Sequence, residues 1–176
     1  MNSRPNASIY TIGHSRHAID AFIALMKQGR IRRVVDVRGE PYSRHNPQFN
    51  RERLAGSLEA EGIDYTWGGR YLSGRPGNAR FYGPGGEVLW DEIAASGEFR
   101  GALDSLAADA QSCRLALVCA EEDPMRCHRR FLLTPPLLRR GVEVLHLRGD
   151  GRVEPESALA GREVAASAGV QQDLFE

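Results

Sequence analysis

The sequence predicts a single α/β domain, with a mostly parallel, Rossmann-like sheet of about five strands and helices on both faces. Three observations support this prediction. The chain has 176 residues, a length that suits one domain with its own core. Short apolar runs alternate with longer segments of helical spacing, which is typical of parallel strands joined by right-handed helical crossovers. Four of these runs are nearly all apolar, as in strands buried on both faces.

The expected strands are five β-rich apolar runs, and the expected helices lie between them. The strands are Ser8–Ile12, Val34–Val37, Ile63–Trp67, Leu115–Cys119 and Val142–Leu147. Helical spacing predicts helices over Ala18–Lys27, Asn50–Ala60, Glu87–Ala94, Phe99–Ala108 and Pro124–Leu133. The glycine-rich segment Gly68–Gly86 is expected to be a loop, of a length typical of functional lids. We expect the domain to cover residues 1–151, a flexible linker to cover 152–170 and a tail to cover 171–176.

Polar and reactive side chains follow the carboxyl ends of these strands. In doubly wound sheets ligands bind beyond those ends, so we expect one pocket at this edge. The candidates for binding substrate or phosphate in this pocket are Ser15, Asp36, Arg38, Ser43, Arg44, His128 and Arg129. The candidates for catalysis are His14, Cys119, Glu121 and Cys127.

Several stretches of the chain resemble one family. They are "YTIGHS" (Tyr10–Ser15), "VVDVRGEPYSR" (Val34–Arg44), "FNRERLAGSLEAEGIDYTWGG" (Phe49–Gly69), "VCAEEDPMRCHRR" (Val118–Arg130) and "VEVLHLRGDG" (Val142–Gly151). Together they resemble the family called domain of unknown function 488. The sequence departs from the family pattern at Trp67 and at Pro135-Pro136, which interrupt a helix that is normally continuous. The resemblance implies a fold and a set of motif residues but no reaction, so the function is argued from the residues.

The stretch "CAEEDPMRCHRR" (Cys119–Arg130) holds most of the candidate chemistry. Asp123 and Pro124 are typical of an N-cap and a first helical position, which predicts an anion near a helix start at Pro124. The spacing C-x7-C-H lacks the paired short spacings of closed zinc sites. We therefore predict reduced, metal-free cysteines and no cofactor. A divalent metal held by Cys119, Cys127 and one histidine stays open as the alternative.

Each catalytic candidate has an alternative interpretation. Glu121 directly follows a buried strand, which fits a general acid or base, although a solvated turn would also place a glutamate there. The cysteines fit a nucleophile or metal ligands, and otherwise small core side chains. His14 fits an anion pocket or simple packing. Asp36 and Arg38 fit a ligand site or a buried structural ion pair.

The composition narrows the function class. Lys+Arg and Asp+Glu both number 23, so the net charge is zero and affinity for a polyanion requires a local patch. The chain shows no signal peptide and no run near the roughly 20 apolar residues of a membrane span, so we expect a cytoplasmic protein with no membrane partner. Neither a G-x-G-x-x-G fingerprint after the first strand nor a Walker A motif is present, which disfavours nicotinamide, flavin and ATP chemistry.

Two functions remain. The favoured one is a nucleic-acid- or nucleotide-processing enzyme in DNA repair or modified-base metabolism, hydrolase- or glycosylase-like. Arginines and aromatic residues alternate in Gly68–Gly86, which suits phosphates and stacked bases. The alternative is a non-catalytic nucleotide- or DNA-binding module tethered to the replication clamp. The crowding of titratable groups favours the enzyme.

The last residues, "QQDLFE", resemble the peptide by which bacterial polymerases and repair proteins bind the sliding clamp. Gln171, Asp173, Leu174 and Phe175 are the candidate partner-binding residues. The alternative is that Leu174 and Phe175 cover an apolar patch of the domain. Clamp binding would concentrate the protein at DNA without strong DNA affinity of its own.

Overall fold

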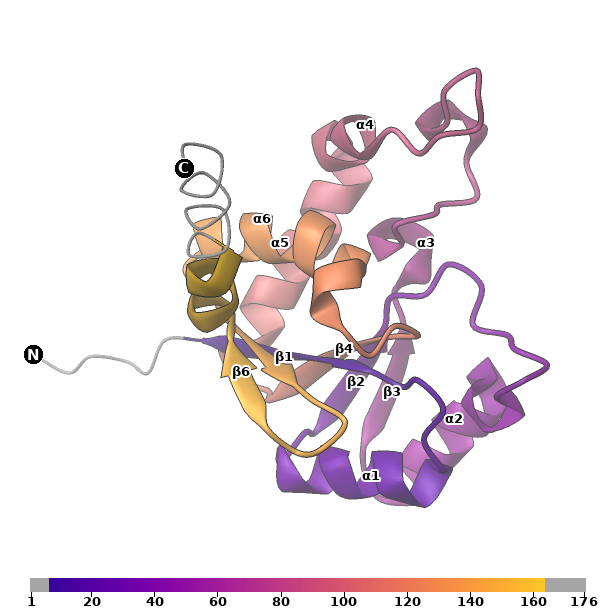
Figure 1. Cartoon of the computed structure of the whole chain (residues 1–176), viewed down its shortest axis with the longest axis vertical. Helices are drawn as coiled ribbons and strands as arrows, with labels where there is room; N and C mark the ends of the chain where they lie inside the picture. Colours follow the sequence, from indigo (N-terminus) through magenta and orange to yellow (C-terminus); the bar gives the residue numbers. More distant parts are fainter. Residues whose placement is uncertain (1–6, 164–176) are drawn as a thin grey trace, which may run out of the picture.

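The structure, a computed structural model, describes residues 7–163. Six strands form one sheet in the order β3-β2-β4-β1-β5-β6 (Figure 1). Their bounds are β1 Ser8–Gly13, β2 Arg33–Asp36, β3 Asp64–Trp67, β4 Leu115–Cys119, β5 Glu143–Leu147 and β6 Val153–Pro155. The first five strands are parallel, and β6 runs antiparallel to β5. The predicted α/β class with a mostly parallel sheet is confirmed.

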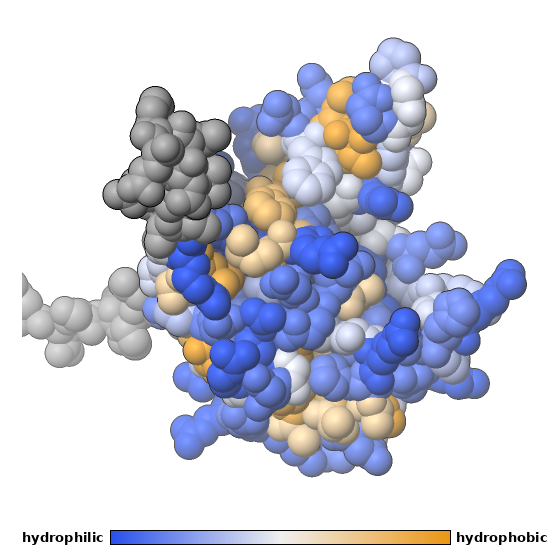
Figure 2. All heavy atoms as spheres, viewed as in Figure 1, coloured by the Kyte–Doolittle hydropathy of each residue, from blue (hydrophilic) through white to orange (hydrophobic). Residues whose placement is uncertain are grey.

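Helices cover both faces of the sheet and give three layers (Figure 1). One face packs against α1 (Ile19–Gln28) and α2 (Arg51–Glu59), and the other against α3 (Gly69–Leu72), α4 (Trp90–Ala95), α5 (Gly97–Asp109) and α6 (Thr134–Arg139). Each face encloses its own apolar core, with Phe22 and Leu54 in one and Leu103 and Leu137 in the other. Figure 2 shows mostly hydrophilic residues on the face it draws, with apolar residues in small groups. Burial on both faces explains why the central strands β1, β2 and β4 are apolar along most of their length.

The chain reverses its direction across the sheet between β1 and β4, which are neighbours. It leaves β1 for β2 through α1 on one face, and it leaves β4 for β5 through α6 on the other face. The two connections therefore diverge. Such a divergence opens a crevice beyond the carboxyl ends of the two strands, where ligands bind in open α/β sheets.

The segment after Gly151 differs from the expected linker. Val153–Pro155 forms β6, and residues 156–163 are helical. Glu156 is buried and pairs with Arg130 and His146 of the domain. The domain therefore includes residues 152–163, which corrects the expected boundary. The remainder of the expected linker and the tail, residues 164–176, lies outside the described residues.

The expected helix over Pro124–Leu133 is also corrected. Pro124–Arg126 is a single 3-10 turn, and Cys127 then has an extended backbone (φ −130°, ψ 141°). Arg129–Leu133 follows as a short π-helix before α6, since the prolines 135 and 136 lack the N–H groups that would continue a regular ladder. Asp123 does accept a hydrogen bond from the Met125 N–H. A three-residue turn has no macrodipole to hold an anion, so the basis for an anion site at Pro124 is lost.

The glycine-rich segment is partly regular rather than one loop. It contains α3 and a 3-10 turn over Ala79–Phe81, and Tyr82 forms a bridge to Val88 just beyond it. Within the described part of the chain, no helix combines the length and the apolar character needed to cross a membrane.

Candidate functional site

The site is built where β1 and β4 end. Gly13, the last residue of β1, pairs in register with Cys119, the last residue of β4. Just beyond them the backbone N–H of His14 donates to the Cys119 carbonyl at 2.9 Å. A Cβ at position 13 would lie 1.7 Å from the carbonyl oxygen of Glu121. Glycine at this position is therefore required for the chain after β4 to cross the end of β1.

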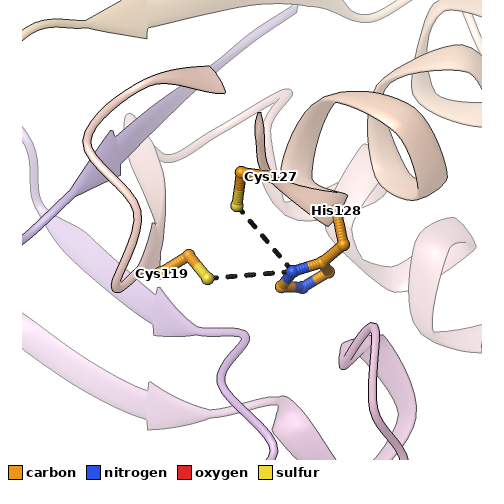
Figure 3. A group of neighbouring side chains, drawn as sticks. All are labelled: Cys119, Cys127 and His128. Atoms are coloured by element: carbon orange, nitrogen blue, oxygen red, sulfur yellow. Dashed lines mark hydrogen bonds between the residues drawn. The ribbon is translucent and has the colours of Figure 1, made fainter. Parts of the chain in front are cut away.

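Cys119, Cys127 and His128 form a compact cluster at this edge (Figure 3). The Nδ1 atom of His128 lies 3.7 Å from the Sγ of Cys119 and 3.8 Å from the Sγ of Cys127. The ring of His128 packs against Gly74, where a Cβ would lie 2.6 Å from the His128 Cβ. The Nε2 atom of His128 is buried and has no hydrogen-bond partner among residues 7–163.

Arg129 lies beneath the cluster and is only 1% exposed. Its Nε donates to the Cys127 Sγ at 3.1 Å, and its Nη2 donates to the carbonyl oxygens of Glu121 (2.5 Å) and Glu122 (3.2 Å). Within residues 7–163 no carboxylate lies close enough to form an ion pair with it. A buried cation requires a nearby anion, and the geometry leaves the Cys127 thiolate as that anion.

The two thiols of the cluster are electrostatically unequal. The neighbouring Cys119 thiol lowers the pKa of Cys127, and His128 and Arg129 lower it further, against the effect of burial. The proximity of Cys127, together with burial, raises the pKa of Cys119. Of the two cysteines, Cys127 is therefore the one whose surroundings favour the thiolate form.

His14 belongs to a second buried network next to the cluster. Its Nδ1 donates to the carbonyl of Ser15 at 2.9 Å, and its Nε2 accepts from Arg38 at 3.0 Å. Arg38 in turn forms a bidentate pair with Asp36, which is fully buried. Burial, and then the positive charge of Arg38, lower the pKa of His14 to about 4. His14 is therefore neutral, and both of its ring nitrogens are already engaged.

The strand ends open into a cavity of about 1210 Å³. The cluster residues all line it. The arginines in its wall are Arg16, Arg38, Arg75 and Arg126, and the aromatic residues are Tyr42, Tyr82, Trp90 and Phe131. Three of these rings are well exposed, Tyr42 at 67%, Phe131 at 45% and Trp90 at 39%.

The two glutamates after β4 have different environments. Glu121 is exposed and lines the cavity. Glu122 is held by Arg148 at 2.9 Å, and this hydrogen bond lowers the pKa of Glu122. Glu121 is thus the carboxylate of this pair that a ligand in the cavity can contact.

Most residues that the sequence nominated lie at this cavity. The lining includes His14, Ser15, Arg38, Ser43, Cys119, Glu121, Cys127 and His128. Asp36 and Arg129 are buried beneath it, and Arg44 is exposed and is not part of the lining. The candidate partner-binding residues Gln171, Asp173, Leu174 and Phe175 lie outside the described residues.

The glycine-rich segment contributes only part of its arginines and aromatics. Arg75 and Tyr82 line the cavity. Arg80 instead stacks on Phe81, which is buried in the core, and pairs with Glu98. Arg70 stacks on its neighbour Tyr71.

Sequence reasoning missed several residues that line the cavity, among them Arg16, Tyr42, Gly74, Trp90 and Phe131. Arg16 and Tyr42 adjoin the nominated residues Ser15 and Ser43, so their positions were a usable signal. Gly74 lies within Gly68–Gly86, so the expectation of a functional lid there was a signal for it. Trp90 begins α4 beyond that segment and carried no such signal.

Comparison with known proteins identifies a family but no individual relative. The family model described as "Domain of unknown function DUF488" matches residues 18–134. No curated protein and no solved structure matches the chain significantly.

Proposed function

The chain belongs to the DUF488 family, and from its site we propose that it is an enzyme acting on a nucleotide or a short single-stranded stretch of nucleic acid. One observation carries the proposal. Exposed arginines, exposed aromatic rings and a thiol–imidazole cluster line the same cavity.

The arginines supply the affinity for phosphate. Arg16, Arg75 and Arg126 are exposed in the cavity wall, and within residues 7–163 none of them forms an ion pair. Arginine suits phosphate because its planar fork donates two parallel hydrogen bonds. In a chain of zero net charge, this local group provides the positive field that a phosphate ligand requires.

The aromatic side chains supply the affinity for bases. Tyr42, Trp90 and Phe131 expose large apolar rings to the cavity rather than burying them. Stacking of a base on such a ring contributes about 1–3 kcal/mol. A single strand or a free nucleotide presents the faces of its bases, whereas a duplex does not.

The cluster favours an enzyme over a binding module. A cavity that only binds a nucleotide has no use for a thiolate stabilised by a buried arginine, and such perturbed groups gather at reactive sites. Glu121 is the exposed carboxylate beside the cluster and is proposed as the acid or base of the reaction. A non-catalytic module tethered to the replication clamp remains the competing function.

Calorimetric titration tests the binding. A nucleoside monophosphate or a short oligonucleotide should bind more tightly than inorganic phosphate or a nucleoside alone. Arg75→Ala, Arg126→Ala and Trp90→Ala should each weaken binding by about tenfold. Arg80→Ala is the matched control, because Arg80 pairs with Glu98 outside the cavity. Equal binding by all variants would refute the proposal.

Mass spectrometry of the ligand after incubation separates the enzyme from the binding module. Glu121→Gln should bind the ligand as the native chain does but leave it unchanged. A ligand that both proteins bind and neither alters would favour the module.

A further inference from the structure

We propose that Cys119, Cys127 and His128 bind one zinc ion, with the fourth coordination position open to the cavity. The proposal replaces the expectation of metal-free cysteines. That expectation came from the C-x7-C-H spacing. The spacing does not show that the chain after β4 folds back and places Cys127 and His128 beside Cys119.

The sulfur-to-nitrogen distances suit a tetrahedral zinc site. The three ligand atoms lie within 4.8 Å of one another, and the two sulfur-to-nitrogen distances are 3.7 and 3.8 Å (Figure 3). Zn–S bonds of about 2.3 Å and Zn–N bonds of about 2.0–2.1 Å place sulfur and nitrogen roughly 3.6 Å apart in a tetrahedron. The two sulfur-to-nitrogen distances therefore already match a shared zinc ion to within a few tenths of an ångström. The two sulfurs, which lie within 4.8 Å of each other, would stand about 3.8 Å apart around the ion.

Hydrogen bonding alone explains the convergence poorly. One nitrogen, Nδ1 of His128, faces both sulfurs, and both distances are long for hydrogen bonds. A single ring proton cannot be directed well at two acceptors. A cation in the centre of the three atoms satisfies all of them at once.

The donor set selects the metal. Two sulfurs and one imidazole are soft and intermediate ligands, which favour zinc over magnesium or calcium. Arg129 donates to the Cys127 sulfur, the kind of outer hydrogen bond that orients a metal ligand. Gly74 keeps the His128 ring in place from the other side.

The site has an open coordination position. All three ligands line the cavity, and no fourth His, Cys, Asp or Glu of residues 7–163 joins the group. Structural zinc sites close with four protein ligands, whereas sites of three protein ligands leave a position for water or substrate. The zinc claim stands on the cluster alone. Its deeper consequence, that the open position faces the ligand of the cavity, rests on the proposed function.

Metal analysis of the full chain tests the site. The native chain, purified without chelator and dialysed against metal-free buffer, should retain one zinc per chain. Cys119→Ser, Cys127→Ser and His128→Ala should each lose stoichiometric zinc. Cys113→Ser is the matched control, because Cys113 is a free thiol outside the cluster. Native chain without zinc that also fails to take it up on titration would overturn the proposal, as would a cluster variant that keeps it.

A second measurement uses the native chain alone, so it tests the site even if the variants do not fold. Zinc added to the apoprotein should slow the reaction of two of its three thiols with a thiol reagent, and cobalt in place of zinc should show thiolate-to-metal charge-transfer absorption. Thiol reactivity that is independent of zinc would overturn the site.

Nucleotide titration of the zinc-loaded and the stripped protein separates the zinc claim from the proposed function. A native chain that holds zinc but binds no nucleotide would refute only the proposed function. A native chain that binds nucleotide but takes up no zinc would refute only the metal site.

Discussion

Arg129 is the residue whose role differs most from its sequence-based interpretation. It was expected to contact phosphate at the edge of the sheet, and the structure buries it beneath the cluster with a sulfur and two carbonyl oxygens as its partners. Its neighbour Arg126 is exposed in the cavity wall. Two arginines three positions apart thus have opposite environments, because the extended backbone at Cys127 turns the chain between them.

Arg129→Met should lower the free energy of unfolding by about 3–5 kcal/mol, because it leaves a buried thiolate and two carbonyl oxygens without their donor. Arg126→Met removes the same charge from an exposed side chain and should change the free energy of unfolding by no more than about 0.5 kcal/mol. Urea unfolding of both variants checks this. A similar loss in both would mean that the burial of Arg129 has no energetic role.

His14 predicts a pH dependence of stability. Its pKa is about 4 in the folded chain against 6.5 for a free histidine. Between these values the unfolded chain binds a proton and the folded chain does not, so stability falls as the pH decreases from about 6.5 to about 4. The contribution of His14 is about 3 kcal/mol.

The check is the melting temperature across this pH range in the native chain and in His14→Gln. Glutamine keeps an acceptor for Arg38 but does not titrate. The variant should therefore show a shallower decline than the native chain. Parallel curves would show that His14 is not held neutral by the fold.

Among the structural elements, the end of β1 depends on one glycine. Gly13→Ala would place a Cβ 1.7 Å from the Glu121 carbonyl oxygen, so the turn after β4 would have to move. We expect a loss of about 3 kcal/mol or more, together with displacement of Cys119 from the cluster. Gly101→Ala in α5 meets nothing within 4 Å and should instead stabilise the chain by about 0.5–1 kcal/mol. Thermal melts of the two variants check this. A melting temperature that shifts in the same direction in both variants would contradict the prediction.

The strand β6 and the helical residues after it complete the domain. Glu156 accepts from Arg130 and from the Nε2 of His146, and the Nδ1 of His146 accepts from Thr11 of β1. A chain that ends at residue 151 loses this carboxylate and leaves Arg130 buried without a partner there. It should be destabilised by about 3–5 kcal/mol relative to a chain that ends at residue 163. Equal unfolding curves for the two chains would mean that the domain ends at residue 151, as the sequence predicts.

For the molecule as a whole, the reversal of strand order between β1 and β4 places the cavity. The two central strands end in Gly13 and Cys119, and their connections leave on opposite faces. Cys119 therefore ends a central strand, and Glu121, Cys127 and His128 follow it in the turn after β4, while Arg75 and Trp90 line the cavity from the glycine-rich segment and from α4. This division suits a fixed chemical centre with an adaptable binding wall.

The clamp-binding prediction concerns residues 171–176, which the structure does not describe. We expect the native chain to bind a bacterial sliding clamp in a titration, since glutamine, aspartate and a Leu-Phe pair match a two-anchor recognition peptide. The double variant Leu174→Ala, Phe175→Ala should lose this binding, with cavity binding of nucleotide as the internal control. Equal binding of both chains, or binding by neither, would remove the link to replication.

Much of the fold was predictable because it is encoded locally. All five expected strands exist, and each observed bound lies within one residue of the expected one. The central strands were readable because nearly apolar runs are typical of strands buried on both faces. The strand β6 was missed because Val153–Pro155 is short, partly exposed and contains proline, which is tolerated at a sheet edge. The helix at Pro124 was misread because its N-cap signal, Asp123-Pro124, is genuine but is followed by only one turn.

The sequence alone determined which residues end the central strands, and so it placed His14, Cys119 and Glu121 at one edge. It did so because strand ends and turn residues are read from neighbours along the chain. Only the tertiary structure decided that Arg129 is buried while Arg126 faces the cavity, and that Cys119, Cys127 and His128 converge within 4.8 Å. These outcomes depend on strand order and on a backbone turn at Cys127 that brings separate segments together, and no local pattern of residues encodes such contacts.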